Sequence, residues 1–301
     1  MNLQEFVQKM KTMVQEHLGS GHEVISQQVK KNNGIVLEAL TIREDGSNIA
    51  PTIYIEPFYH DYMENELTLI EAAKNICEAY QNSKVTTDFD VNSFCDFSQV
   101  RDRIIYKLVN YEKNKERLDG IPHDVFLDFA IIYCVLIEQK AEGYTGTILI
   151  HYNHLVLWGI YEEDLKTYAM KNTPALLASE LLPMKDVIDQ MIPCEAEDKI
   201  PFDDAHEVPM YILSNKCKLD GATCLLYPGL LEKIATEWNR DFYVLPSSIH
   251  ETILIPKDDS VDAKTLSSMV KEVNDTQVMP AEILSDHAYV YSHASKQLMA
   301  A

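Results

Sequence analysis

The chain has 301 residues, 46% hydrophobic and 24% charged, and these proportions are typical of a globular protein and exclude a chain disordered throughout. Its formal net charge is −21, from 47 acidic and 26 basic residues. Binding to nucleic acid and to anionic membranes depends mainly on Lys and Arg, so this charge excludes a general electrostatic attraction to either surface. We therefore expect neither nucleic acid nor a membrane as a partner.

The first part of the chain predicts two helices and a hairpin. Residues 2–17 and 65–81 carry apolar side chains at the three- and four-residue spacing of amphipathic helices. Residues 34–42 and 50–56 are rich in β-branched residues and flank a turn sequence at 44–48. They predict a β-hairpin.

The middle of the chain predicts three strands and a helix. Residues 103–111, 125–138 and 145–151 are aromatic and β-branched, which indicates strands that we expect to be antiparallel. The second run is long enough to form a buried helix instead, and periodicity alone leaves this alternative open. Residues 161–172 begin with acidic residues and predict a helix that stops before Pro174.

Trp158 closes an apolar run that begins at Leu155, and Gly159 follows where the chain must turn into the next helix. We expect Trp158 to be buried and to anchor that helix to the sheet, and Gly159 to adopt a positive φ. The alternative is an exposed Trp158 that binds a partner, because Trp is frequent at binding hot spots.

Prolines and acidic residues are concentrated in residues 193–209, which contain Pro193, Pro201 and Pro209 together with six acids. This composition predicts a linker. We therefore expect an N-terminal domain over 1–192 and a C-terminal domain over 210–301.

The C-terminal part predicts strands and helices in alternation, at 210–214 (strand), 221–238 (helix), 241–246 and 250–256 (strands), 262–275 (helix) and 288–292 (strand). Together with the elements before the linker, they predict an α+β fold. We expect antiparallel sheets with helices packed on one face, in two subdomains.

The cysteines indicate a reducing compartment. Six occur, at Cys77, Cys95, Cys134, Cys194, Cys217 and Cys224, and none forms a C-x-x-C pair. We expect reduced, structural thiols. The N-terminus lacks an apolar signal core, and no segment approaches 18 apolar residues, so we expect a cytoplasmic protein.

Common catalytic and nucleotide-binding signatures are missing from the sequence. It contains no G-x-G-x-x-G, G-x-x-x-x-G-K-[ST], H-E-x-x-H or G-x-S-x-G motif. With only ten glycines, a phosphate-binding loop is not expected, and no cofactor is expected either.

Ser247, Ser248, His250 and Glu251 are the most suggestive catalytic candidates, because a hydroxyl, an imidazole and a carboxylate can form a nucleophilic site. Such groups are usually assembled from distant positions, and the polar tip of a hairpin between two strands explains the same residues. Both interpretations stay open.

Two groups of residues could hold a metal ion. Asp203, Asp204, His206 and Glu207 are the densest set of ligand-type side chains, and grouped carboxylates suit hard cations. His151 and His154 are three residues apart, and imidazole suits zinc. The alternative interpretations are an acidic loop in an acidic protein and two half-exposed histidines where a strand ends.

Three segments of the chain resemble an uncharacterised family from gut Firmicutes, known only as a domain of unknown function. They are LTIREDGSNIAPTIYI at 40–55, LVLWGIYEEDLKTYAMKNTP at 155–174 and GATCLLYPGLLEKIATEWNRDFYVLPSSIHETILIP at 221–256. The order of Trp-Gly, an acidic-start helix ending in Asn-Thr, and a helix–strand–strand unit is similar, more distantly, to the Bacillus YtpQ family. The resemblance implies no activity, cofactor or site residue. Members of the family resemble accessory genes of mobile elements, which implies a role directed at a partner.

The sequence thus leads to two hypotheses for function. The first is a non-catalytic cytoplasmic accessory protein that binds another protein, encoded by a mobile element and directed at a host or defence protein. One form of this hypothesis is a protein that mimics the charge of nucleic acid. The second is a hydrolase of unknown substrate that uses the turn at 247–251 or a metal ion at 203–207.

Overall fold

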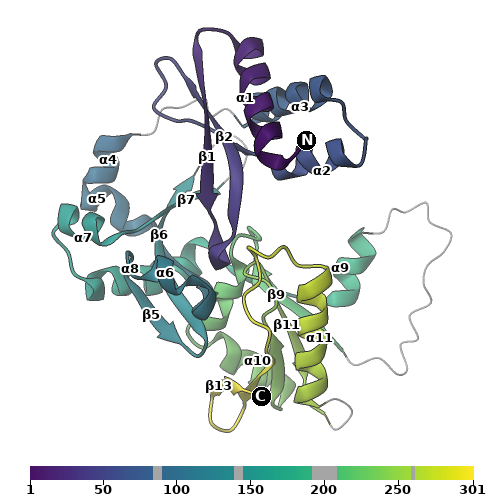
Figure 1. Cartoon of the computed structure of the whole chain (residues 1–301). Coiled ribbons are helices and arrows are strands. Elements are labelled where there is room, and N and C mark those ends of the chain that lie inside the picture. Colours follow the sequence, from purple (N-terminus) through teal and green to yellow (C-terminus); the bar gives the residue numbers. More distant parts are fainter. Residues whose placement is uncertain (84–89, 139–144, 192–208, 259–261) are drawn as a thin grey trace. The chain divides into compact units, whose positions relative to one another are not determined.

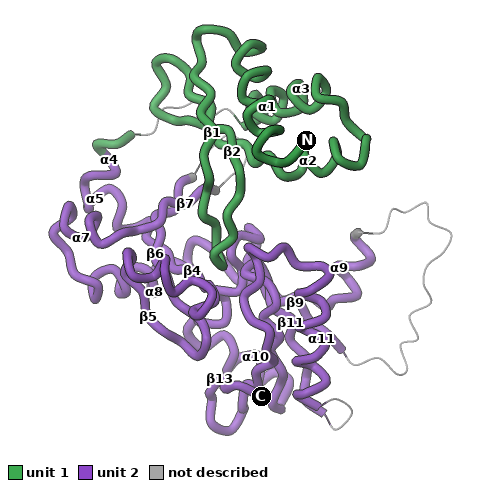
Figure 2. The backbone as a smooth tube through the Cα atoms, viewed as in Figure 1, with its two compact units in different colours: residues 1–92 green, residues 93–301 purple. Residues whose placement is uncertain are grey.

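The computed structural model describes residues 1–83, 90–138, 145–191, 209–258 and 262–301, coloured along the chain in Figure 1. The chain divides into two compact units, Met1–Asn92 and Ser93–Ala301, which Figure 2 distinguishes by colour. All strand pairs are antiparallel, and helices pack against the sheets. The predicted α+β class is confirmed.

Unit 1 is a three-stranded sheet with helices packed against it. Its elements are α1 (Leu3–Leu18), β1 (His22–Lys30), β2 (Val36–Glu44), β3 (Thr52–Tyr54), α2 (Glu56–Met63) and α3 (Leu69–Asn82), with strand order β1-β2-β3. The predicted β2–β3 hairpin and the helices α1 and α3 are confirmed, whereas β1 and α2 were not predicted. Apolar side chains from α1, α3 and the sheet form one core, among them Phe6, Leu40 and Ile76.

Both long helices of unit 1 begin at side chains that cap their free N–H groups. Asn2 accepts from the backbone N–H of Glu5, and Thr68 accepts from that of Glu71, while each glutamate accepts in return from the capping residue. This reciprocal capping box fixes where each helix starts.

Unit 2 contains a four-stranded sheet formed by β4 (Ile104–Asn110), β5 (His123–Phe126), β6 (Phe129–Glu138) and β7 (Thr145–Leu149). Strand β6 pairs with all three of the others. The apolar run at 125–138 is therefore neither one strand nor a helix, because the chain reverses between Phe126 and Phe129. Leu127 adopts a positive φ of 56° in this turn.

The second sheet of unit 2 has six strands in the order β13-β12-β10-β11-β9-β8. They are β8 (Ser179–Pro183), β9 (Tyr211–Asn215), β10 (Phe242–Leu245), β11 (Thr252–Pro256), β12 (Tyr289–Ser292) and β13 (Gln297–Ala300). The predicted hairpin of β10 and β11 forms, and β13, which was not predicted, follows β12.

The division of the chain falls at 92/93 and not within the proline-rich segment 193–209. Strand β8 lies before this segment and β9 after it, yet the two pair along their whole length, so both belong to unit 2. Of the predicted linker itself, only Pro209 is among the described residues.

The α-helices of unit 2 are α4 (Val91–Cys95, which begins in unit 1), α5 (Phe97–Val100), α6 (Lys115–Leu118), α7 (Tyr152–Trp158), α8 (Glu162–Leu176), α9 (Met184–Met191), α10 (Leu230–Trp238) and α11 (Ala263–Thr276), and its 3-10 helices are η2 (Arg101–Arg103), η3 (Glu112–Asn114) and η4 (Gly221–Leu226). None of the helices in the described ranges combines the length and apolar composition that crossing a bilayer requires.

Two helix predictions need correction. Helix α8 does not stop before Pro174 but continues to Leu176. Proline has no N–H and so removes one hydrogen bond of the helix. The last turn still forms, because the N–H of Leu177 donates to the carbonyl of Thr173 at 2.9 Å. The helix predicted at 221–238 is split into η4 and α10 at Gly229, whose φ of 73° is unfavourable for other residues.

A partly buried polar cluster joins the β5–β6 turn to the start of β12 and the residues just before it. The side chain of Asp128 accepts hydrogen bonds from the hydroxyl of Ser285, at 3.0 Å, and from that of Tyr289. The amide of Asn110 donates to the carbonyl of Leu284 at 3.0 Å. Satisfied buried hydrogen bonds of this kind fix one arrangement of the two sheets within unit 2.

Candidate functional site

The predicted nucleophilic residues, Ser247, Ser248, His250 and Glu251, lie in the turn between β10 and β11 and at its end. The hydrogen bonds of the two serines stabilise this turn. The hydroxyl oxygen of Ser248 accepts the backbone N–H of His250 at 3.1 Å, and the carbonyl of Ser247 accepts that of Leu284 at 2.9 Å. The imidazole of His250 points Nε2 to Glu282, 3.6 Å away, while Glu251 is exposed. No hydroxyl-to-imidazole hydrogen bond is present among these described residues, so the nucleophile hypothesis stays a prediction.

This turn packs closely on η4, and Gly221 makes the close approach possible. The hydroxyl of Ser214 donates to the carbonyl of His250 at 2.8 Å, directly beside Gly221. A Cβ atom at residue 221 would lie 2.1 Å from that hydroxyl oxygen and 2.3 Å from the carbonyl oxygen. Only glycine fits here without a shift of the backbone.

We expect Gly221→Ala to lower the free energy of unfolding by about 1–3 kcal/mol, because overpacking a tight site forces its neighbours apart. Urea titration followed by circular dichroism measures this loss. Gly120→Ala is the matched control in the same unit, since its Cβ would meet only Arg117 O at 3.9 Å. Equal stabilities of the two variants would contradict the close approach at Gly221.

The predicted metal ligands are only partly described. Asp203, Asp204, His206 and Glu207 lie outside the described residues. His151 precedes α7 and is exposed, while the ring of His154 packs edge-on against Phe94. The described parts of the chain contain no group of three or more His, Cys, Asp or Glu side chains placed to hold a metal ion.

The buried thiols are protonated at neutral pH. Burial raises the pKa of Cys224 to about 12 and that of Cys134 to about 11. A thiolate is the reactive form of cysteine, so burial makes both thiols poor nucleophiles. Cys224 instead donates its S–H to the carbonyl of Ser214 at 3.2 Å, a structural contact between η4 and β9.

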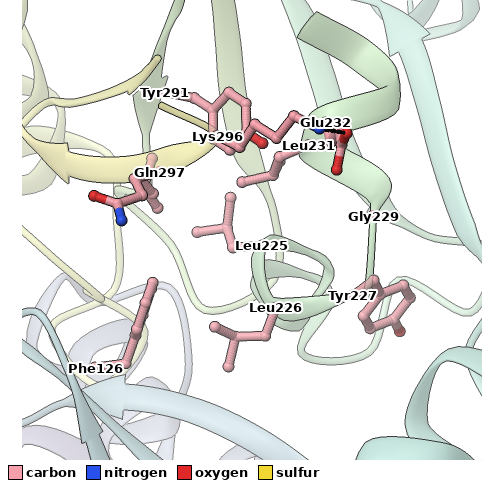
Figure 3. Close-up of a pocket in the computed structure, with 11 residues that line it drawn as sticks. Phe126, Leu225, Leu226, Tyr227, Gly229, Leu231, Glu232, Tyr291, Lys296 and Gln297 are labelled. Atoms are coloured by element: carbon pink, nitrogen blue, oxygen red, sulfur yellow. Dashed lines mark hydrogen bonds and ion pairs between the residues drawn. The ribbon is translucent and has the colours of Figure 1, made fainter. Parts of the chain in front are cut away.

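A pocket of about 500 Å³ opens between η4, α10 and the β12–β13 hairpin, with Phe126 from the end of β5 on its other side (Figure 3). Its wall combines polar surface with several apolar side chains. Leu225, Leu231 and Tyr291 are buried at its base, while Phe126 and Leu226 are half-buried. Leu298 of β13 also lines the pocket.

The polar side chains of the pocket lie at its rim. Lys296 and Glu232 form an ion pair there, seen at the upper side of Figure 3, and Gln297 lies beside them. The pKa of Lys296 is raised because its ammonium donates to the Glu232 carboxylate. The exposed pair supplies both signs of charge next to an apolar surface, an arrangement suited to the rim of a binding site.

Strand β13 borders the pocket and is the edge of the six-stranded sheet. Its residues pair with β12 on one side, and among the described residues no strand pairs with the other side. The backbone N–H of Ala301 donates to the carbonyl of Ala288 at 3.1 Å. Along an antiparallel strand, the N–H and C=O groups of every second residue point to the same neighbouring strand. Those of Leu298 and Ala300 therefore point away from β12.

This site was not predicted from the sequence. Its lining comes from four separate parts of the chain, and β13 is a four-residue segment that follows a lysine turn. The one sequence signal for β13 was the alternation of side-chain type in 297–300, where Leu298 is the one partly buried residue. Four residues are too few for that pattern to stand out.

The comparisons with known proteins place the chain in a family without assigning an activity. A comparison with curated proteins and a comparison with solved structures gave no match. The model of a family described as a family of unknown function (DUF5688) matches residues 3–293, nearly the whole chain. The chain therefore belongs to the DUF5688 family.

Proposed function

We propose that this protein binds another protein, and that it does so by taking an extended segment of the partner as an added strand on β13. The observation that carries the proposal is the free edge of β13 beside an open pocket. An unpaired edge strand offers a row of N–H and C=O groups to an incoming strand, and adjacent pockets select its side chains.

The register of the hairpin indicates which partner residue enters the pocket. Tyr291 and Leu298 are paired across β12 and β13, and both side chains line the pocket. Side chains of paired residues lie on the same face of a sheet. A partner residue opposite Leu298 would therefore direct its side chain to the same face, toward Phe126, and a large apolar residue would suit it.

The cysteines support a reducing, cytoplasmic compartment as the place of action. Cys77, Cys95, Cys134, Cys217 and Cys224 are free thiols, and two of them, Cys95 and Cys217, are exposed. Exposed thiols are more stable in the cytoplasm than in an oxidising compartment. The resemblance to a gut-Firmicutes family associated with mobile elements supports a search for the partner in such bacteria.

A pull-down with an Ala300→Pro variant tests the strand addition. Proline removes the N–H of residue 300, which faces away from β12, so we expect the hairpin to form but the partner to be lost. Ala300→Val keeps this N–H and is the matched control. From a lysate of a gut Firmicute at low salt, wild type and Ala300→Val should retain the same stoichiometric protein, and Ala300→Pro should not.

Two results would contradict the proposal. The first is that wild-type protein retains no stoichiometric partner at low salt. The second is that Ala300→Pro, with an unchanged circular dichroism spectrum, retains the same partner as Ala300→Val. If the retained partner is a nucleic-acid-binding protein and added DNA displaces it, the protein acts by mimicking the charge of nucleic acid.

A further inference from the structure

Helix α7 carries apolar side chains on its outer face as well as on its inner face, although it lies on the surface of unit 2. Its sequence is Tyr-Asn-His-Leu-Val-Leu-Trp. The inner face, formed by Leu155 and Trp158, is buried in the main core of unit 2. A surface helix ordinarily presents polar side chains on its other face.

On the outer face of α7, Asn153 is the polar side chain among exposed apolar ones. Tyr152 is 41% exposed, Val156 83% and Leu157 53%. Tyr152 and Val156 are four residues apart and so lie on one side of the helix. Tyr161, just beyond the Gly159 that ends the helix, is 77% exposed. Exposed apolar side chains that are grouped in this way are typical of interaction surfaces, whereas single ones are ordinary.

Acidic side chains border this outer face. Glu162, Glu163 and Asp164 form the first turn of α8 and are all exposed. Only Gly159, Ile160 and Tyr161 separate α7 from this turn. The pKa of Tyr152 is raised by partial burial and by the negative charge of Glu162, in agreement with that short connection. The outer face therefore combines an apolar centre with a negatively charged border.

We propose that the outer face of α7, with the first turn of α8, binds an amphipathic helix of a partner protein that carries Lys or Arg beside its apolar stripe. The apolar stripe covers Val156 and Leu157, and the basic residues pair with Glu162 and Glu163. A second copy of this chain is disfavoured as the occupant, because it would bring like charges together. An anionic membrane is disfavoured for the same reason. This surface is distinct from β13, so either proposal can fail without the other.

Titration with two synthetic helical peptides tests the inference. One peptide alternates Leu and Lys at helical spacing, and the other replaces every Lys with Glu. We expect the Leu/Lys peptide to bind wild-type protein, and Val156→Ser/Leu157→Ser to raise its Kd at least tenfold, because that variant removes apolar contact and keeps every charge. Glu162→Gln/Glu163→Gln should weaken binding several-fold at low salt and flatten its salt dependence.

Met269→Ser/Val273→Ser on α11 is the matched control, since these side chains are 50% and 42% exposed on another helix of unit 2. This control should bind the Leu/Lys peptide like wild type. Equal affinity of the wild type and Val156→Ser/Leu157→Ser would overturn the proposal by showing general attraction to an acidic protein. Preference for the Leu/Glu peptide would overturn it too, as would a dimer in sedimentation that Val156→Ser/Leu157→Ser abolishes.

Discussion

Trp158→Ala is expected to lower the free energy of unfolding by about 3–5 kcal/mol, the range for emptying a large aromatic site in a core. The side chain is 8% exposed and packs against the rings of Phe94 and Phe97. Its indole N–H donates to the carbonyl of Phe94 at 2.9 Å. The indole thus joins α7 to α4 and α5, so its loss leaves a cavity and removes this hydrogen bond.

Trp158→Phe is the control that separates these two contributions. It keeps an aromatic ring but removes the N–H donor, and we expect it to lose less stability than Trp158→Ala. Urea unfolding followed by circular dichroism measures both variants. A Trp158→Ala protein that unfolds like wild type but loses a binding partner would show that Trp158 is an interface residue, contrary to its burial here.

Lys107→Met is expected to cost about 3–5 kcal/mol, as when one partner of a buried ion pair is removed. Nζ of Lys107 on β4 lies 2.6 Å from Oδ2 of Asp220, the residue before η4, and the two side chains are 16% and 8% exposed. Without the lysine, the carboxylate of Asp220 stays buried and loses its ion-pair partner. The pair also links β4 to the η4 region of unit 2.

Lys107→Met/Asp220→Asn removes both charges, and we expect it to recover most of the loss. Asn also tolerates the positive φ of 49° at residue 220. A double-mutant cycle in urea then gives the coupling energy between the two side chains. Additive effects of the two single substitutions would contradict a coupled pair.

The pH dependence of this pair has a definite sign. Burial opposes the charge of Lys107, but Cys134, at the alkaline pH where its thiol ionises, and the carboxylate of Asp220, which also accepts a hydrogen bond from the lysine, outweigh it and raise the pKa of Lys107 above 10.5. A raised pKa in the folded state means that the contribution is full below 10.5 and is lost as pH rises through the folded pKa. The stability difference between wild type and Lys107→Met should therefore be constant near neutral pH and narrow above about 10.5.

Local patterns in the sequence were sufficient for much of the fold. Helical periodicity located α1 and α3, and turn residues between β-branched runs located the β2–β3 hairpin. Gly159 caps α7 with a φ of 65°, and Trp158 is buried, as its apolar neighbours indicated. In each case, neighbours in sequence determine the structure.

The remaining elements depend on contacts that no local pattern contains. Strand β1 is polar at several positions, since half of its residues face away from the core, so β-propensity alone missed it. The run at 125–138 reverses at Leu127, a residue that rarely takes a positive φ. Phe126 and Leu298 are far apart in sequence and line the same pocket, and only the completed fold creates that surface.

The proposed function rests on an unpaired strand edge, and amide hydrogen exchange measures that edge directly. In free protein, the amides of Leu298 and Ala300 should exchange fast and that of Met299, which faces β12, more slowly. With the captured partner bound, we expect exchange at Leu298 and Ala300 to slow markedly while Met299 changes little. Unchanged exchange at Leu298 and Ala300 in the bound protein would contradict strand addition on β13.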